Sequence, residues 1–274
     1  MIVNNLRIIV RRLGRQKLNT ALHTVGLTLG ISVCLLIGLF LRHELSFDGY
    51  HAKADRIYRI NTTISDRGED EHHFSSPSPL ANALRAEIPE LEHVARVQPN
   101  WGGCLIEITP QKRFEQDYVL LAEPALLDIF DIDVLQGNGH EALRNPFQAL
   151  LTETAAKKFF GNEDPIGKTF KCENEYTFTV AGVVADQPGN THLPFTVLLS
   201  FAEGIRFPGC DTSPMSWGNV SGGSTFVVLP ENLQPADLKT RLQDIYDRNI
   251  NKIADMPEWI RFYARTQALN RIHL

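Results

Sequence analysis

Apolar residues are concentrated in one uninterrupted stretch near the N-terminus. Residues 21–41 read ALHTVGLTLGISVCLLIGLFL and contain no Asp, Glu, Lys or Arg. At a rise of about 1.5 Å per residue, this stretch forms a helix of roughly 31 Å, which matches the hydrocarbon core of a bilayer. No other run in the sequence approaches this length. The pattern therefore predicts a single transmembrane helix over residues 21–41.

Charged residues before the stretch predict its orientation. Residues 1–20 contain five basic residues and no acidic one: Arg7, Arg11, Arg12, Arg15 and Lys17. Basic residues beside a span stay in the cytoplasm, so residues 1–20 are expected to form a cytoplasmic anchor. Residues 42–274 then lie outside, which in a bacterium means a periplasmic domain held by a single pass through the inner membrane. A cleaved signal peptide is the alternative, but its apolar core is shorter, about 7–15 residues.

Two finer patterns occur within these segments. Apolar residues recur every three or four positions from Ile2 to Leu13 with arginines between them, which predicts a basic amphipathic helix lying in the cytoplasmic interface. Small residues recur every fourth position in the span, at Gly26, Gly30, Cys34 and Gly38. Because small residues let membrane helices approach closely, this stripe predicts a helix-packing face.

The remaining sequence alternates between strand and helix patterns. Residues 56–64, 94–97 and 104–109 read as strands, and residues 80–88 carry the apolar face of a short helix, so this part begins as β-α-β. Residues 66–70 read as a charged turn. A strand at 224–229, a helix opened by Pro235 and a closing region at 259–274 mirror that beginning.

The middle of the chain mixes short elements. It contains a strand at 118–122, helices at 125–130 and 153–160, and a strand pair around 173–175. The whole pattern predicts an α+β fold in which a smaller subdomain is inserted into an outer one. The outer subdomain is expected over about 55–112 and 192–274, and the inserted one over about 113–191.

Charge and cysteine content limit the function of the exported part. The formal net charge is −5, and five of the 27 basic residues precede the span whereas all 32 acidic residues follow it. The exported part is therefore near −10, which argues against nucleic acid as a partner. Cys104, Cys172 and Cys210 lie outside the membrane at no metal-like spacing. One disulfide with one free thiol, or no disulfide, is compatible with this pattern.

Candidate chemistry is sparse. Residues 161–169, GNEDPIGKT, resemble a phosphate-binding loop, but five residues separate the glycines where the motif has four. A helix precedes the segment and a strand follows it, so we interpret it as a turn in which Gly161 ends the helix. The nine histidines show no zinc-site spacing, and His72-His73 is expected in a charged loop. We therefore predict no enzyme, no cofactor and no metal.

Several segments together resemble the N-terminal half of MacB/FtsX-type ABC transporter permeases, in their form with a MacB-like periplasmic core domain. The matching segments are the basic N-terminus with the TVGLTLGISVCLLIGLFL span, ELSFDGYH (44–51), DRIYR (55–59), IF (129–130), LQG (135–137), LTETAA (151–156), FGNEDPIGKTF (160–170), VAGVV (180–184) and PGNTH (188–192). The similarity covers nearly the whole chain.

This resemblance implies a non-catalytic transporter component. Such permeases work as dimers with a cytoplasmic P-loop ATPase and pass its motion to the periplasm, where a further partner can bind, by mechanotransmission. Residues where span meets domain would carry that motion: Glu44, Phe47, Asp48, Tyr50 and Arg56. The family has three more membrane helices after the domain and this sequence contains none, so it is expected to be a fragment or a truncated product. The alternative is a single-pass, membrane-anchored periplasmic binding or sensing module.

Overall fold

The computed structural model describes residues 17–272 except 101–102, 202–205, 208–209, 212–216, 221–222 and 253–256. The chain divides into two compact units, one ending at Phe47 and the other beginning at Asp48. The first unit consists mainly of helix α2 (Lys17–Glu44, 28 residues), which contains an 18-residue window with a mean hydropathy of 2.3 and is long and apolar enough to cross a membrane. The helix predicted over residues 21–41 is therefore confirmed, with three to four further residues at each end. Arg7, Arg11, Arg12 and Arg15, and the amphipathic helix predicted around them, lie outside the described residues.

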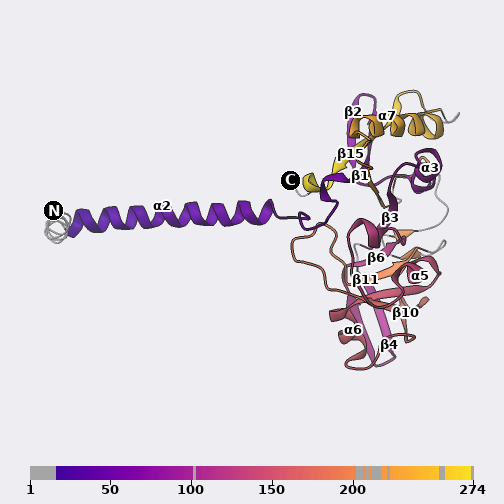
Figure 1. The fold of residues 1–274 in the computed structure, drawn as a ribbon, viewed down its shortest axis with the longest axis horizontal. Helices are drawn as coiled ribbons and strands as arrows, with labels where there is room; N and C mark the ends of the chain where they lie inside the picture. The colour runs from indigo at the N-terminus through magenta and orange to yellow at the C-terminus, as the bar shows by residue number, and fades with distance from the viewer. Residues whose placement is uncertain are drawn as a thin grey trace. The chain divides into compact units, whose positions relative to one another are not determined.

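The second unit begins and ends with two interleaved β-α-β halves (Figure 1). The first half contains η1 (Ala54–Arg56), β1 (Ile57–Asp66), β2 (Glu69–His73), α3 (Leu80–Glu87) and β3 (His93–Asn100). The second contains β14 (Ser224–Val228), α7 (Pro235–Tyr246), η2 (Asp247–Asn251), β15 (Ile260–Ala268) and η3 (Leu269–Arg271). The four long strands pair antiparallel in the order β15-β1-β14-β3, the arrangement of a ferredoxin-like split β-α-β unit. The predicted α+β class with β-α-β halves is confirmed.

The segment between the halves extends the same sheet. Its strands are β4 (Cys104–Thr109), β5 (Lys112–Gln116), β6 (Val119–Ala122), β7 (Val134–Gly137), β8 (Gln148–Thr152), β9 (Thr169–Cys172), β10 (Tyr176–Val184) and β11 (Val197–Ser200), and its helices are α4 (Leu126–Ile129), α5 (Gly139–Arg144) and α6 (Glu153–Phe160). The sheet continues from β3 as β6-β11-β8-β10-β9-β4-β5, and a separate pair joins β12 (Arg206–Phe207) and β13 (Cys210–Asp211). The division into an outer subdomain and an insertion at 113–191 stays a prediction.

Three buried apolar clusters hold the elements on the sheet. Helices α3 and α7 pack on the ferredoxin-like part through Leu84 and Leu242, which are fully buried. Helices α4 and α5 pack on the middle of the sheet, and α6 packs on β8 and β10 through Phe159. Short helices form here because caps and burial compensate for their length: the Thr152 side chain accepts the Ala155 N–H at the start of α6.

On the side away from β1, side chains make the hydrogen bonds to the main chain of β15. The Asn251 amide accepts from the Phe262 N–H at 2.8 Å and donates to the Phe262 carbonyl at 2.9 Å. The Gln243 amide accepts from the Ala264 N–H at 3.1 Å and donates to the same Phe262 carbonyl at 3.1 Å. Strand β15 is the first in the sheet order, so the backbone groups on its outer side have no partner strand. The two amides hydrogen-bond these groups instead.

One sequence-based assignment is wrong and two are confirmed. The charged turn predicted over residues 66–70 is present, narrowed to Arg67 and Gly68, which both have positive φ and join β1 to β2. The loop expected at His72-His73 is instead part of strand β2, which pairs with β1. Strand β2 lacks the apolar alternation that marks most strands and forms because β1 offers it a partner. The turn interpretation of residues 161–169 is confirmed, since Gly161 ends α6 with φ +68° and strand β9 follows.

Replacing Tyr246 by Phe is expected to lower the free energy of unfolding by about 1–2 kcal/mol. The Tyr246 hydroxyl is fully buried and lies 2.9 Å from the Thr62 hydroxyl, so the variant leaves a buried hydroxyl without its partner. Urea unfolding of the full chain in detergent, followed by tryptophan fluorescence, measures the change. Tyr263→Phe is the control, because Tyr263 is exposed, and equal effects of the two substitutions would contradict the prediction.

Candidate functional site

The first residues of the domain are held by a loop far away in the sequence. Asp48 is 1% exposed and has a φ of +56°, and its N–H donates to the Asn190 carbonyl at 3.0 Å. His192 donates twice to the Asp48 carboxylate, from Nδ1 to Oδ2 at 2.7 Å and from its backbone N–H to Oδ1 at 3.2 Å. The two chain segments are 144 residues apart. Asp48 therefore ties the start of the domain to the loop at residues 190–192.

The electrostatics of this pair favour an ionised carboxylate. Burial raises the pKa of Asp48, but the hydrogen bonds and charge of His192 outweigh it, so the pKa lies below its usual value. Tyr50 lies next to this pair with its ring 4.1 Å from that of His51. Burial and the charge of Asp48 raise the pKa of Tyr50, against a hydrogen bond to Thr191. Asp48 and Tyr50, both predicted from the sequence, thus belong to one site.

His51 is a third member of the site. It is 4% exposed, its Nε2 lies 4.0 Å from Asp48 Oδ1, and neither ring nitrogen has a hydrogen-bond partner among the described residues. Burial lowers the pKa of His51 more than the nearby carboxylates Asp48 and Asp131 raise it, so the ring is neutral at neutral pH. Asp131 also accepts the Ala52 N–H at 2.8 Å, which fixes the chain after His51.

Aromatic rings enclose this polar group. Phe130 contacts the His51 ring edge-on at a centroid distance of 5.2 Å and the His192 ring at 5.9 Å, and Phe226 lies 5.7 Å from His192. The aspartate–histidine pair therefore lies among aromatic rings, with the Tyr50 and Thr191 hydroxyls beside it. We interpret it as a structural connection between two segments.

The other predicted junction residues lie elsewhere. Arg56 pairs with Glu92 and donates to the Leu229 carbonyl at 2.9 Å, and Lys53 lies 3.4 Å from Glu92. These hydrogen bonds and charges lower the pKa of Glu92 against a smaller opposing effect of burial. Glu44 and Phe47 belong to the first unit, where the Phe47 ring contacts His43 at 5.3 Å. The structure therefore brings together Asp48 and Tyr50 and places Arg56 in a separate ion-pair group.

Helix α2 carries the remaining described candidates. Gly26, Gly30 and Gly38 have open space where a side chain would start, Cys34 is exposed, and Lys17 is the first residue of the helix. An uncovered stripe of small residues is available for another helix. The helix-packing role of the stripe stays a prediction.

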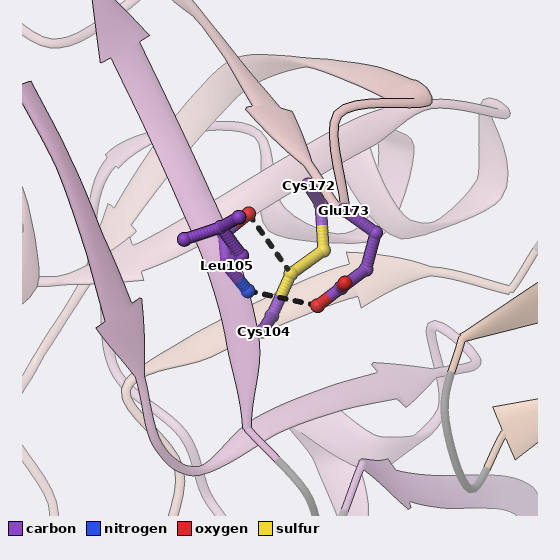
Figure 2. Close-up of a disulfide and its surroundings, with 4 residues drawn as sticks. All are labelled: Cys104, Leu105, Cys172 and Glu173. Atoms are coloured by element: carbon purple, nitrogen blue, oxygen red, sulfur yellow. Dashed lines mark hydrogen bonds between the residues drawn. A yellow bond between two sulfur atoms is a disulfide. The ribbon is translucent and has the colours of Figure 1, made fainter.

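The sequence left the cysteine pairing open, and the structure shows a Cys104–Cys172 disulfide joining β4 to β9 (Figure 2). Beside it, Glu173 accepts the Leu105 N–H at 2.8 Å and donates its own N–H to the Leu105 carbonyl at 2.9 Å. Both sulfurs and the Glu173 carboxylate lie within 4.8 Å of one another. Sulfurs joined in a disulfide are not thiolates, so this group does not offer the ligands of a metal site.

Sequence reasoning missed His51 and His192 as site residues. The motifs that contain them, ELSFDGYH and PGNTH, were both part of the family resemblance. No local pattern connects segments that far apart, because only the folded sheet brings their ends together.

Lowering the pH from 7.5 to 5.5 is expected to destabilise the domain. The pKa of His51 is lower in the folded chain than its ordinary value of 6.5, so the unfolded chain binds the proton first. The contribution of His51 to the free energy of unfolding is then fully present above pH 6.5. It is lost as the pH falls below 6.5, by at most about 1.4 kcal/mol per pH unit for one group. Asp48, whose pKa is also lowered, adds a loss only near and below its ordinary value of 3.8.

Urea unfolding of the full chain at several pH values measures this slope. His51→Phe is expected to flatten it, because the ring no longer titrates. The control His43→Gln changes an exposed histidine at the end of α2, outside the domain, and should leave the slope unchanged. A slope that His51→Phe does not alter would contradict the assignment to His51.

Comparison with known proteins identifies the family. Residues 20–245 match the model of the MacB-like periplasmic core domain. A domain of a candidate permease protein from Porphyromonas gingivalis is 24% identical, with a TM-score of 0.68 over 81% of this chain and 92% of that one. No curated protein matches in sequence.

Two further solved structures share the fold. The periplasmic region of MacB from Actinobacillus actinomycetemcomitans is 17% identical, with a TM-score of 0.51 over 75% of this chain and 87% of that one. The extracellular domain of the noncanonic ABC-type transporter YknZ from Gram-positive bacteria is 11% identical, with a TM-score of 0.50 over 76% and 99%. This chain belongs to the MacB-like periplasmic core domain family, as the periplasmic domain of a MacB/FtsX-type ABC permease preceded by a long apolar helix.

Proposed function

We propose that this chain is a non-catalytic permease component that passes the work of a cytoplasmic ATPase to the periplasm, for export or efflux, by mechanotransmission. The family implies an ATPase partner in general. The observation that carries the proposal is the Asp48–His192 pair, which fixes the first residue of the domain to a loop of its sheet. A displacement at the end of α2 reaches Asp48 through three intervening residues, 45–47.

The chemistry of this pair suits the transmission of force. A buried, charged hydrogen-bonded pair resists separation, because breaking it leaves an uncompensated charge in an apolar surrounding. Arg56 adds a second attachment, since it joins the chain before β1 to the carbonyl that follows β14. Motion of the chain at residue 48 is thereby delivered to both β1 and the 190–192 loop rather than absorbed by a flexible linker.

The membrane part of the proposal rests on α2. The basic residues Arg7, Arg11, Arg12, Arg15 and Lys17 hold its start at the cytoplasmic face of the inner membrane, and the domain lies in the periplasm. The stripe Gly26, Gly30, Cys34 and Gly38 supplies a packing face for other permease helices, and the assembled permease is a homodimer. A periplasmic partner would receive the motion.

Co-purification from native membranes tests the proposal. The tagged full chain is extracted in mild detergent and the bound proteins are identified by mass spectrometry, and a cytoplasmic P-loop ATPase is expected among them. Gly26→Leu with Gly30→Leu should reduce its recovery by blocking the packing face. Thr28→Leu with Ser32→Leu is the matched control, because two residues along a helix correspond to about 200° and so to the opposite side.

The alternative is a membrane-anchored binding or sensing module that works without an ATPase. A folded, membrane-bound chain that recovers no ATPase at native expression would reject the transporter proposal in favour of this alternative. Equal recovery with both pairs of substitutions would reject the packing face while leaving the ATPase partnership intact.

A further inference from the structure

A groove of about 740 Å³ opens beside β1, β2 and β15, in the ferredoxin-like part of the domain, where these strands lie together in Figure 1. Alternate residues of a strand share one face of a sheet, so Arg59, Asn61 and Thr63 project to the face opposite the buried Ile60. The strand register sets Gln267 opposite Arg59, and Arg265 opposite Asn61. The groove is therefore built on a polar sheet face, with walls fixed by strand pairing.

Two arginines line this groove, and His73 of the same lining lies 3.4 Å from Glu71. Arg265 and Arg271 line it together with His72 and His73, and among the described residues Asp55 is the only carboxylate in the lining. Arg59 lies next to it, bound to the lining residue Gln267. Across the part of the chain that the structure describes, no carboxylate lies within 4.0 Å of any of these three arginines.

Pairing with a carboxylate is common among the other described arginines of the domain, but it is not general. Six other arginines are paired with glutamates: Arg56, Arg85, Arg96, Arg113, Arg241 and Arg248. Among the described residues, Arg67, Arg144 and Arg261 also have no carboxylate within 4.0 Å, and they do not line the groove. What distinguishes Arg59, Arg265 and Arg271 is that they gather at one groove.

Gln267 and His72 hold the guanidinium groups of Arg59 and Arg265 in place. Gln267 Oε1 accepts from Arg59 Nη2 at 2.9 Å and from Asn61 Nδ2 at 2.7 Å, and Gln267 Nε2 donates to the Arg271 carbonyl at 2.9 Å. Arg265 Nη1 lies 3.2 Å from His72 Nδ1, which is in turn 2.9 Å from the Thr63 hydroxyl. These amide and imidazole partners orient Arg59 and Arg265 without neutralising them, whereas at Arg271 it is the main-chain carbonyl that is held.

We propose that this groove binds a carboxylate-bearing ligand, either a small polycarboxylate or an acidic segment of a polypeptide. A guanidinium group offers parallel N–H donors that match a carboxylate in a two-point contact. The groove volume is in the range of sites that hold compact ligands.

Binding to the full-length chain in phosphatidylcholine nanodiscs tests this proposal. Fluorescently labelled hexaglutamate is titrated by anisotropy and citrate by calorimetry, with inorganic phosphate as the competitor. Arg265→Gln with Arg271→Gln is expected to weaken binding by about tenfold or more, since each charged hydrogen bond contributes about 1.5–3 kcal/mol. Arg144→Gln is the control, because Arg144 is an exposed arginine on α5 that does not line the groove.

Charge and geometry are separated by a second variant. Arg265→Lys with Arg271→Lys keeps both charges and removes the two-point contact. Its binding affinity is therefore expected to lie between those of the wild type and the glutamine variant. Saturable binding of hexaglutamate alone assigns the site to polypeptide segments, and binding of citrate alone assigns it to small molecules. Binding of neither probe, unchanged binding in the glutamine variant, or displacement by phosphate at equal affinity would overturn the proposal.

Discussion

Replacing Cys104 and Cys172 by alanine is expected to lower the free energy of unfolding of the domain by about 4 kcal/mol. The disulfide joins residues 68 apart in sequence, and this bond restricts the unfolded chain far more than the folded one. Both cysteines are buried where β4 pairs with β9, so the bond joins two strands that are adjacent in the sheet but far apart in the sequence. An oxidising compartment such as the periplasm maintains such a bond.

Urea unfolding of the full chain in detergent measures this loss, because all three tryptophans lie after residue 100, in the domain. Reduction of the wild type with dithiothreitol should reproduce most of the shift without any change of sequence. Cys34→Ala is the matched control, since Cys34 is an exposed, free cysteine in α2. A shift below about 1 kcal/mol for both the double variant and the reduced protein would show that the bond does not stabilise the domain.

Replacing Asp48 by alanine is expected to cost about 3 kcal/mol of unfolding free energy, close to the loss seen when one partner of a buried charged pair is removed. The variant leaves two donors of His192 without an acceptor in a site enclosed by Phe130 and Phe226. It also places alanine at a φ of +56°, where aspartate is tolerated better. Both effects act in the same direction.

Asp48→Asn separates these contributions. Asparagine keeps an acceptor and accepts a positive φ, so it should lose less than alanine does. Glu163→Ala is the control for removing an ion pair, because Glu163 is exposed and its pair with Lys168 is expected to contribute little. If Asp48→Ala were no more harmful than Glu163→Ala, the pair would be incidental, and the proposed route of force through residue 48 would fail with it.

Long elements with a clear period could be predicted from the sequence. Helix α2 follows from its uninterrupted apolar composition, and α7 follows from Leu238, Leu242 and Ile245 on one face after an initial proline. Strand β10 follows from its β-branched residues and from the turn before it. Each of these segments contains enough residues for its pattern to stand out locally.

Short buried elements could not be predicted in this way. Strands β8 and β11 are runs of five and four residues that are buried on both faces, so they show no alternation. Helix α5 has six residues and depends on the Asn138 side chain, which accepts the Glu141 N–H at 3.2 Å. Their structure is set by neighbours that come from elsewhere in the chain.

The same reasoning explains the partial prediction of the site. Asp48 and Tyr50 were reached through a motif beside the span, where local sequence is informative. His192 contributes through a contact between residues 144 apart, which exists only once the sheet has formed. Arg59 and Arg265 likewise become neighbours through the register of β1 and β15 rather than through any spacing along the chain.

The amides of Gln243 and Asn251 have a consequence for assembly. An exposed strand border is a template on which a second polypeptide can add a strand, and this is a common route to aggregation. The Gln243 and Asn251 side chains already hydrogen-bond the main-chain groups of Phe262 and Ala264 that an added strand would pair with. Another copy of the domain therefore cannot extend the sheet there, and any association at this border has to proceed through side chains.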